Sequence, residues 1–224
     1  MGRKPLVSRD GALDGVMRCF WSTGYEAASL EDLLAASSLH RGSFYRAFGG
    51  KRSAFEEALA RYSELIGSED LAPSVTGRGS PMDRLVRLTH ARIDTVLGIS
   101  RTFTSAPAAH QPDQRTPEEA GRPGCLVVNT ALELGPHDDA LRAELARALD
   151  AVRTVIALLV REAIEQGEAD PRLDVRAAAD QILALLMGVT VLASVGTRRR
   201  ELRRTLADGV RSVLQPTTNE GRSK

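Results

Sequence analysis

Apolar residues recur every three or four positions along most of this 224-residue chain, and that spacing is typical of amphipathic helices. The longest example runs from Leu141 to Ala163. No segment shows the two-residue alternation of a half-buried strand. The spacing therefore predicts an all-α fold, and the apolar content of 42% is enough to build a substantial core.

Four short helices are predicted in the first sixty residues. The first ends at Gly24, and a capping box formed by Ser29 and Asp32 opens the second. The third covers residues 41–48, and the fourth begins near Lys51 after the helix-breaking Gly49-Gly50 pair. Two short helices joined by the tight turn at 37–39 form a helix-turn-helix pattern.

The rest of the chain is predicted as long helices separated by two loops. Residues 67–80 and 104–124 are rich in Gly, Pro and Ser, and we expect each to be irregular. Helices are expected at 82–99 and 141–163. The helix at 175–195 is apolar nearly all round and should be buried on every side. The last helix, 198–214, carries an apolar stripe with Leu206 and Val210, which we expect to face a second copy of the chain, and arginines on its solvent side.

The third predicted helix carries the pattern most informative about function. Phe44 and Phe48 are four residues apart and point inward, so Gly42 and Arg46 face outward, with Arg41, Ser43 and Tyr45 on the flanks. Four basic residues and no acidic residue lie between Ser37 and Arg52. Guanidinium groups bind guanine edges in the major groove, and Lys51 and Arg52 can reach phosphates. A solvated amphipathic helix pair is the alternative.

Several motifs in residues 12–62 decide between these alternatives. The stretches 20–26, 29–33, 41–45, 48–51 and 55–59 resemble, in order, the DNA-binding domain of TetR-family (tetracycline-repressor-like) regulators. The resemblance implies base contacts by Arg41, Gly42, Ser43 and Arg46, and phosphate contacts by Ser29, Tyr45 and Lys51. Two positions depart from the family pattern: Ser38 replaces the usual turn glycine, and Ala54 replaces a leucine.

Residues 123–134 resemble a segment shared by one subgroup of the same family. The resemblance implies a helical C-terminal domain with a ligand cavity in each subunit and a dimer formed by the last long helices. We therefore expect a helix-turn-helix domain at 1–66, a ligand-binding and dimerisation domain at 67–216, and a polar tail at 217–224.

Polar residues on otherwise apolar helices are candidates to line such a cavity. Cys125 is either a packed apolar residue or a reactive thiol that senses electrophiles or oxidants. The full set of candidate ligand-binding residues is His90, Cys125, Asn129, Glu133 and Met187.

Composition excludes other classes of protein. Two cysteines are too few for a disulfide framework, no metal-ligand spacing exists, and no nucleophile has a plausible base. The longest apolar run has 14 residues, too short for a membrane span, and no signal peptide precedes it. A net charge of +1 argues against indiscriminate coating of nucleic acid. We expect a cytoplasmic protein without enzymatic activity, cofactor or metal.

The interpretation that follows is a homodimeric transcriptional repressor, released from a palindromic operator by a small molecule. Two alternatives stay open: a regulator that senses electrophiles through cysteine, and a helical protein-interaction module that does not bind DNA. An all-α enzyme that uses the C-terminal cavity is the weakest reading, because no acid/base pair is present.

Overall fold

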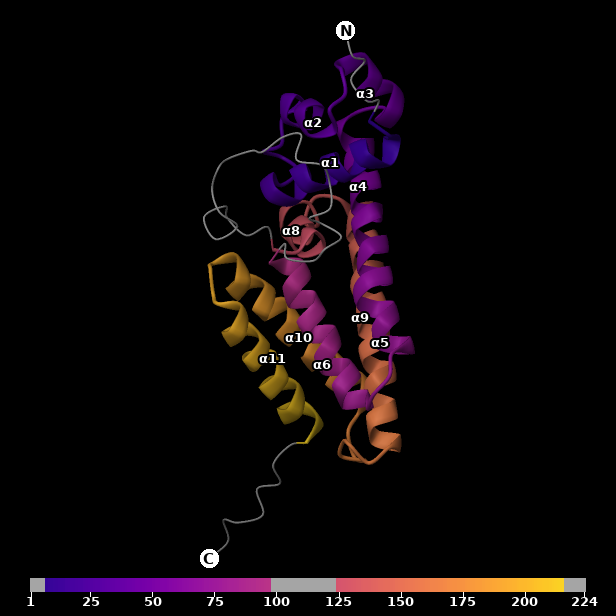
Figure 1. Ribbon diagram of the computed structural model, residues 1–224, viewed down its shortest axis with the longest axis vertical. Coiled ribbons are helices and arrows are strands. Elements are labelled where there is room, and N and C mark those ends of the chain that lie inside the picture. Colours follow the sequence, from indigo (N-terminus) through magenta and orange to yellow (C-terminus); the bar gives the residue numbers. More distant parts are fainter. Residues whose placement is uncertain (1–6, 98–123, 216–224) are drawn as a thin grey trace, which may run out of the picture.

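The computed structural model describes residues 7–97 and 124–215, and every regular element in these two ranges is a helix, which confirms the all-α prediction. Three helices gather at one end of the molecule, at the top of Figure 1, and a fourth runs down from them toward the remaining helices. Their bounds are α1 (Arg9–Thr23), α2 (Leu30–Ser37), α3 (Arg41–Phe48) and α4 (Lys51–Ile66).

Local chemistry fixes the ends of these helices. The hydroxyl of Ser29 accepts from the Asp32 N–H while the Asp32 carboxylate accepts from the Ser29 N–H, so the predicted capping box is confirmed. The turn between α2 and α3 places Ser38 in the left-handed region at φ 55°, a conformation that costs a residue with a Cβ about 1 kcal/mol. Phe20 packs edge-on against Phe55 with ring centroids 5.0 Å apart, which joins α1 to α4.

Residues 67–76 are helical, so the prediction of a loop over 67–80 is wrong for most of its length. After α4 the chain makes a π-helical turn, η1 (Gly67–Leu71), and a short helix, α5 (Ala72–Thr76). The Ser74 hydroxyl donates to the Asp70 carbonyl at 2.7 Å, and the Asp70 carboxylate is held by buried groups on another helix. The predicted domain boundary after residue 66 therefore falls within continuous helical backbone.

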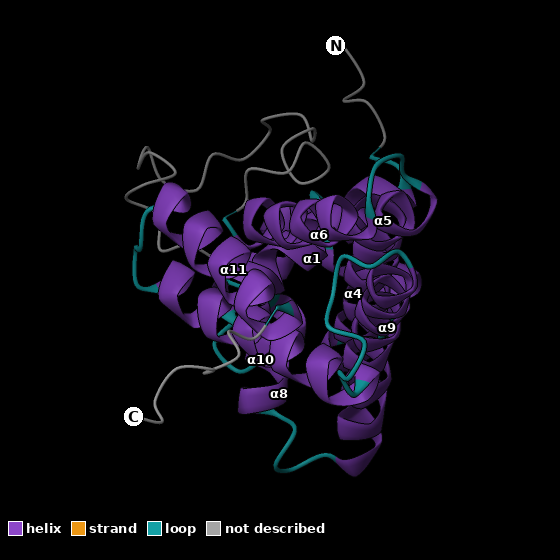
Figure 2. Cartoon of the chain, turned by 90° about the horizontal axis from the view of Figure 1, so that it is seen from below, coloured by secondary structure: helices purple, strands orange, loops and turns teal. Residues whose placement is uncertain are grey.

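The C-terminal helices form a bundle below the first three. They are α6 (Pro81–Val96), α8 (Leu126–Glu133), α9 (Asp139–Glu165), α10 (Val175–Ser194) and α11 (Arg199–Leu214). Helix α10 packs against α9 and α11, α6 packs against both α9 and α11, and α8 packs against α4 and α9 (Figures 1 and 2). The predicted loop at 104–124 lies almost wholly outside the described residues, and the predicted tail at 217–224 lies entirely outside them.

The apolar stripe of α11 is buried within its own chain. Leu206 and Val210 are both 0% exposed and pack against α6 and α10, so the prediction that this stripe faces a second copy is wrong. The arginine side of the helix is not simply solvated either. Arg199 and Arg203 both bind Asp94 of α6, at 2.6 and 2.8 Å.

Within its own chain helix α10 is buried on one side only, so the predicted burial on every side requires a second copy of the chain. Val191, Leu192 and Val195, at its C-terminal end, are 54%, 43% and 75% exposed. By length and composition this helix is apolar enough to cross a membrane, but core helices of globular proteins pass the same test, and 44% of its apolar window is buried here. One chain supplies neighbours for only one face of α10.

Candidate nucleic-acid interface and ligand cavity

The third helix presents one face to the core and the other to solvent. Phe44 is 0% exposed and its ring lies 5.2 Å from that of Phe48. The opposite face is open, and an added Cβ on Gly42 would meet no atom within 4 Å. The exposed residues of this face are Arg41, Gly42, Tyr45 and Arg46, with Ser43 half-buried beside them.

The contacts that these side chains make in the free protein are weak and exposed. Arg41 lies 3.3 Å from Glu31, with both side chains mostly exposed, and Arg46 donates to the Ser43 hydroxyl at 3.1 Å. Exposed pairs of this kind contribute little to stability. Both guanidinium groups can therefore exchange these partners for DNA at small cost.

Ser29 and Lys51 lie at helix N-termini that border α3. Ser29 is the exposed N-cap of α2. The Lys51 ammonium donates to the Glu26 carbonyl at 3.2 Å and lies 4.7 Å from the centre of the Tyr25 ring. The pKa of Asp32 is lowered by its hydrogen bonds from Ser29, so its carboxylate stays ionised in the capping box.

Three polar contacts join the helix-turn-helix region to the bundle below it. The indole N–H of Trp21 donates to the Gly124 carbonyl at 2.8 Å. Arg52 bridges Glu56 and Asp138, both at 2.7 Å, so it is engaged at this junction and does not point freely toward phosphate as the sequence suggested.

Glu133 makes the third contact. It ends α8, and its two carboxylate oxygens accept from the backbone N–H groups of Tyr25 and Glu26, at 3.0 and 2.7 Å. Glu133 was predicted to line a ligand cavity; in the structure its carboxylate binds this loop and lines neither of the two cavities described below. Because the Glu26 carbonyl also accepts from Lys51, the carboxylate holds the loop that supports a candidate phosphate-binding residue.

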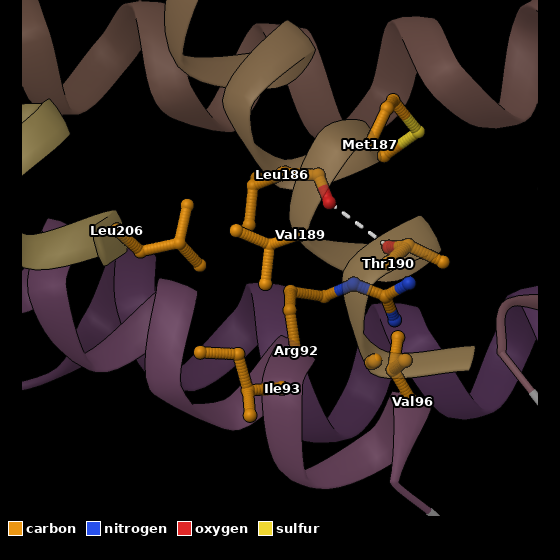
Figure 3. Close-up of a pocket in the computed structure, with 9 residues that line it drawn as sticks. Arg92, Ile93, Val96, Leu186, Met187, Val189, Thr190 and Leu206 are labelled. Atoms are coloured by element: carbon orange, nitrogen blue, oxygen red, sulfur yellow. Dashed lines mark hydrogen bonds between the residues drawn. The ribbon is translucent and has the colours of Figure 1, made fainter. Parts of the chain in front are cut away.

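A cavity of about 110 Å³ lies in the bundle between α4, α6, α8, α9 and α10. Its wall is mostly apolar, and two of the predicted ligand-binding residues, Cys125 and Met187, belong to it. A second void of about 10 Å³ adjoins it and shares Arg92 and Met187 with it. Figure 3 shows the Arg92 side chain reaching from α6 toward Thr190 and Met187 of α10.

Arg92 is the functional candidate that sequence reasoning missed. It is 5% exposed, its Nη1 donates to the Asp70 carboxylate at 2.9 Å, and its Nη2 lies 3.5 Å from the Cys125 sulfur. A signal existed, because Arg92 lies four residues after Leu88 and four before Val96, at the spacing of core positions. Asp70, in a segment that was predicted as a loop, gave no such signal.

Burial dominates the electrostatics of Asp70. Removal from water raises the pKa of Asp70 in spite of the adjacent Arg92 guanidinium, which acts to lower it. The pKa of Tyr62 is likewise raised by burial, next to Cys125 and Arg92. Charged groups kept in such a place need close partners, which the Arg92–Asp70 pair supplies.

The two remaining predicted cavity residues, His90 and Asn129, do not line either void. His90 lies on α6 beside Arg203 of α11, and burial, followed by the charge of Arg203, lowers its pKa. Asn129 lies on α8, close to the backbone of Gly124. Within residues 7–97 and 124–215, no three His, Cys, Asp or Glu side chains cluster as metal ligands would.

Two family models match this chain, one at each end. Residues 12–58 match the bacterial regulatory proteins of the tetR family, and residues 114–208 match the tetracyclin repressor-like C-terminal domain. Together they include the whole of α2, α3, α9 and α10. The structural division between a recognition end and a helical bundle therefore has a counterpart in both models.

Full-length relatives agree with these matches. The chain is 28% identical to the HTH-type transcriptional repressor ComR of Escherichia coli (strain K12) over 90% of this chain and 86% of that protein. It is 23% identical to the repressor DhaR of Mycobacterium sp. (strain GP1) over 98% of both. Among solved structures, the TetR family regulator CifR, as a cysteine mutant complexed with a 26-base-pair operator, superposes with a TM-score of 0.73 at 27% identity, over 94% and 99% of the two chains. The protein belongs to the TetR family of DNA-binding transcriptional regulators.

Proposed function

We propose that the protein is a homodimeric repressor that binds a two-fold symmetric operator through α3 and is released by a small molecule held in the bundle cavity. The observation that carries the proposal is the open basic face of α3, formed by Arg41, Gly42, Tyr45 and Arg46 above a fully buried Phe44. A helix with this exposure can enter a major groove. The role is that of a cytoplasmic regulator without enzymatic activity.

The contact residues divide by the chemistry they can offer. Arg41 and Arg46 supply bidentate donors to base edges, Ser43 supplies a hydroxyl, and Gly42 leaves room for close approach. Ser29, Tyr45 and Lys51 offer hydroxyl and ammonium donors, which are groups that bind phosphates. CifR, the solved relative described above, is complexed with operator DNA in its structure, which supports the same assignment for this chain.

Selection of binding sequences from random DNA duplexes tests this assignment. The purified protein should enrich a sequence with approximate two-fold symmetry, because a dimer presents two copies of α3. Recovery of sequences without any such symmetry would contradict the paired-recognition mechanism. A protein that enriches no sequence would instead support the protein-interaction alternative.

A second copy of the chain is the partner that best fits the exposed end of α10. Three apolar side chains that are among the most exposed in the described residues lie within one five-residue stretch: Val191, Leu192 and Val195. An apolar patch of this kind is a liability in water unless another surface covers it, and self-association by a two-fold axis is the commonest solution.

The oligomeric state tests this surface. Substitution of Val191 and Val195 by glutamate should give a folded monomer by sedimentation velocity, with operator affinity reduced because the two recognition helices are no longer linked. Leu132→Glu is the matched control, since Leu132 is 73% exposed but lies on α8. A dimer that survives the double substitution would place the interface elsewhere.

The route from cavity to DNA passes through α8. Its first residues line the cavity, with Cys125 as N-cap and Val127 in the first turn. Its last residue, Glu133, holds the α1–α2 loop. A ligand that displaces the start of this eight-residue helix, about 12 Å long at 1.5 Å per residue, moves the anchor of the recognition end.

A cysteine-based sensor is the second candidate function, and the position of Cys125 favours it. Its sulfur lies in the cavity wall, 3.5 Å from the Arg92 Nη2. The sulfur is therefore placed where it would meet a reactive small molecule that enters the cavity. Alkylation by N-ethylmaleimide should then release operator DNA from the wild-type protein and from Cys19→Ser, but not from Cys125→Ser. Release that persists in Cys125→Ser would exclude this candidate.

A further inference from the structure

We propose that the cavity selects a small uncharged molecule with an apolar body and one hydrogen-bond acceptor, and that Arg92 is the residue that selects it. This inference rests on the proposed function, because it names the class of ligand for the same cavity. It is carried by the cavity's size, by the charge balance in its wall, and by one weak hydrogen bond that a ligand can replace.

The size of the cavity limits the ligand. An apolar cavity of about 150 Å³ holds one benzene molecule, and the cavity here measures about 110 Å³. Apolar side chains such as Ile66, Leu149 and Val152 make up most of the wall. Because this cavity is the smaller of the two, the apolar body of the ligand should contain no more than about six non-hydrogen atoms, the number in benzene.

The charge balance of the wall limits the ligand further. Arg92 is the one lining residue, among the described residues, whose side chain is ionised at neutral pH. Its charge is matched by Asp70, which is 4% exposed and also accepts from the Thr95 hydroxyl. An anionic ligand would leave an uncompensated negative charge in an apolar cavity, and a cationic ligand would face the guanidinium; both are costly to bury. A neutral ligand avoids both penalties.

One hydrogen bond of Arg92 is available for exchange. A guanidinium carries five N–H donors, whereas a cysteine sulfur is a weak acceptor. The contact from Nη2 to the Cys125 sulfur is 3.5 Å long, against 2.9 Å from Nη1 to Asp70. A carbonyl or ether oxygen is a better acceptor than sulfur, so a ligand oxygen placed between Arg92 and Cys125 takes over that N–H.

Three probes with the same ring test the proposal on the full-length protein: cyclohexane, cyclohexanone and cyclohexanecarboxylate. Isothermal titration calorimetry should show cyclohexanone binding about tenfold more tightly than cyclohexane, the gain expected from one hydrogen bond. It should also bind more tightly than cyclohexanecarboxylate. This comparison needs no substitution, so it stays decisive even if variants of the buried pair fail to fold.

A pair of double variants then assigns the preference to Arg92. Asp70→Asn with Arg92→Gln removes both charges together and should bring the affinity for cyclohexanone close to that for cyclohexane. The matched control is Arg84→Gln with Glu162→Gln, which neutralises another buried arginine of α6, paired with a carboxylate, outside the cavity wall. The control should keep the preference, and melting followed by circular dichroism checks the fold of both.

The outcomes separate this inference from the proposed function. Equal affinity for cyclohexane and cyclohexanone would overturn selection by Arg92 but leave the cavity as a ligand site. Tightest binding of the carboxylate would overturn the uncharged class. If none of the three probes binds while the same sample still binds its selected operator, the ligand inference fails and the DNA-binding function stands.

Discussion

The recognition face and the cavity use the same residue, arginine, in opposite surroundings. Arg46 lies exposed on α3 and pairs with a hydroxyl three residues away. Arg92 is 5% exposed, and its partners Asp70 and Cys125 lie 22 and 33 positions away in the chain. An exposed arginine can exchange its partners without disturbing the fold, whereas a buried arginine is also part of the fold. Substitutions in the two regions should therefore affect different measurements.

The largest effect on stability should come from the buried arginine. Arg92→Met leaves the Asp70 carboxylate buried without its cation, which should lower the free energy of unfolding by about 3–5 kcal/mol. Arg46→Ala, on the exposed face, should change it by less than about 0.5 kcal/mol. Urea denaturation followed by circular dichroism measures both. Similar losses in the two variants would remove the contrast between the regions.

Operator binding should show the opposite contrast: substitutions on the exposed recognition face should have the larger effect. Arg46→Ala should cost about 1–3 kcal/mol of binding free energy and relax the preference at one position of each half-site. Lys51→Ala should weaken binding to all sequences alike and reduce the salt dependence, because a phosphate contact carries no sequence information. Arg204→Ala, on the exposed side of α11, is the control. A changed sequence preference in Lys51→Ala would show that this lysine does not act through phosphate.

Glu133 tests the connection between the regions. Glu133→Ala removes two charge-assisted hydrogen bonds to the α1–α2 loop, and we expect it to weaken operator binding by about 1–2 kcal/mol, since such bonds are partly solvated here. The loss should come from disorder of the loop rather than from lost DNA contact. Hydrogen exchange at Tyr25 and Glu26 measures that disorder. Glu165→Ala is the reference variant. If hydrogen exchange at Tyr25 and Glu26 is the same in Glu133→Ala as in this reference, the loop is held by other contacts.

Substitutions at two glycines test the recognition region through smaller changes in stability. Gly42→Ala should raise stability by about 0.5–1 kcal/mol, the helix propensity gain, because its Cβ meets no neighbour. Operator binding should fall, because that Cβ points toward DNA. Gly15→Ala should instead lower stability, because its Cβ would overlap the Ala36 carbonyl where α1 crosses α2. Undiminished operator binding by Gly42→Ala would argue against close approach at this position.

The smallest effect at neutral pH is expected at Cys19, the thiol in the recognition region. Burial raises its pKa to about 11 from an ordinary value of 9.0. The folded protein therefore holds this proton more tightly than the unfolded chain does, and the contribution of Cys19 to stability should be constant below pH 9 and decline from there to about pH 11. Cys19→Ala should make the alkaline decline in stability shallower. Rapid alkylation of Cys19 at pH 8 would contradict the raised pKa.

Contacts close in sequence were predictable, and contacts between distant residues were not. The capping box of Ser29 and Asp32 and the inward pair Phe44 and Phe48 are each set by a spacing of three or four residues, which a helix converts directly into a shared face. The burial of Leu206 could not be assigned to the correct neighbour, because an apolar stripe does not say whether its own chain or a second copy covers it. The Arg92–Asp70 pair joins two elements whose proximity only the folded chain creates.

The single tryptophan of the chain lies at the junction, where the Trp21 indole donates to the Gly124 carbonyl and its ring meets that of Tyr62 at 5.5 Å. The emission wavelength of an indole depends on whether the ring is buried or exposed to water. A rearrangement that breaks the bond to Gly124 changes the surroundings of the indole, so the wavelength of its fluorescence reports this contact without an added dye. Trp21 is thus an intrinsic fluorescence probe at the junction through which, on this proposal, ligand binding changes DNA binding.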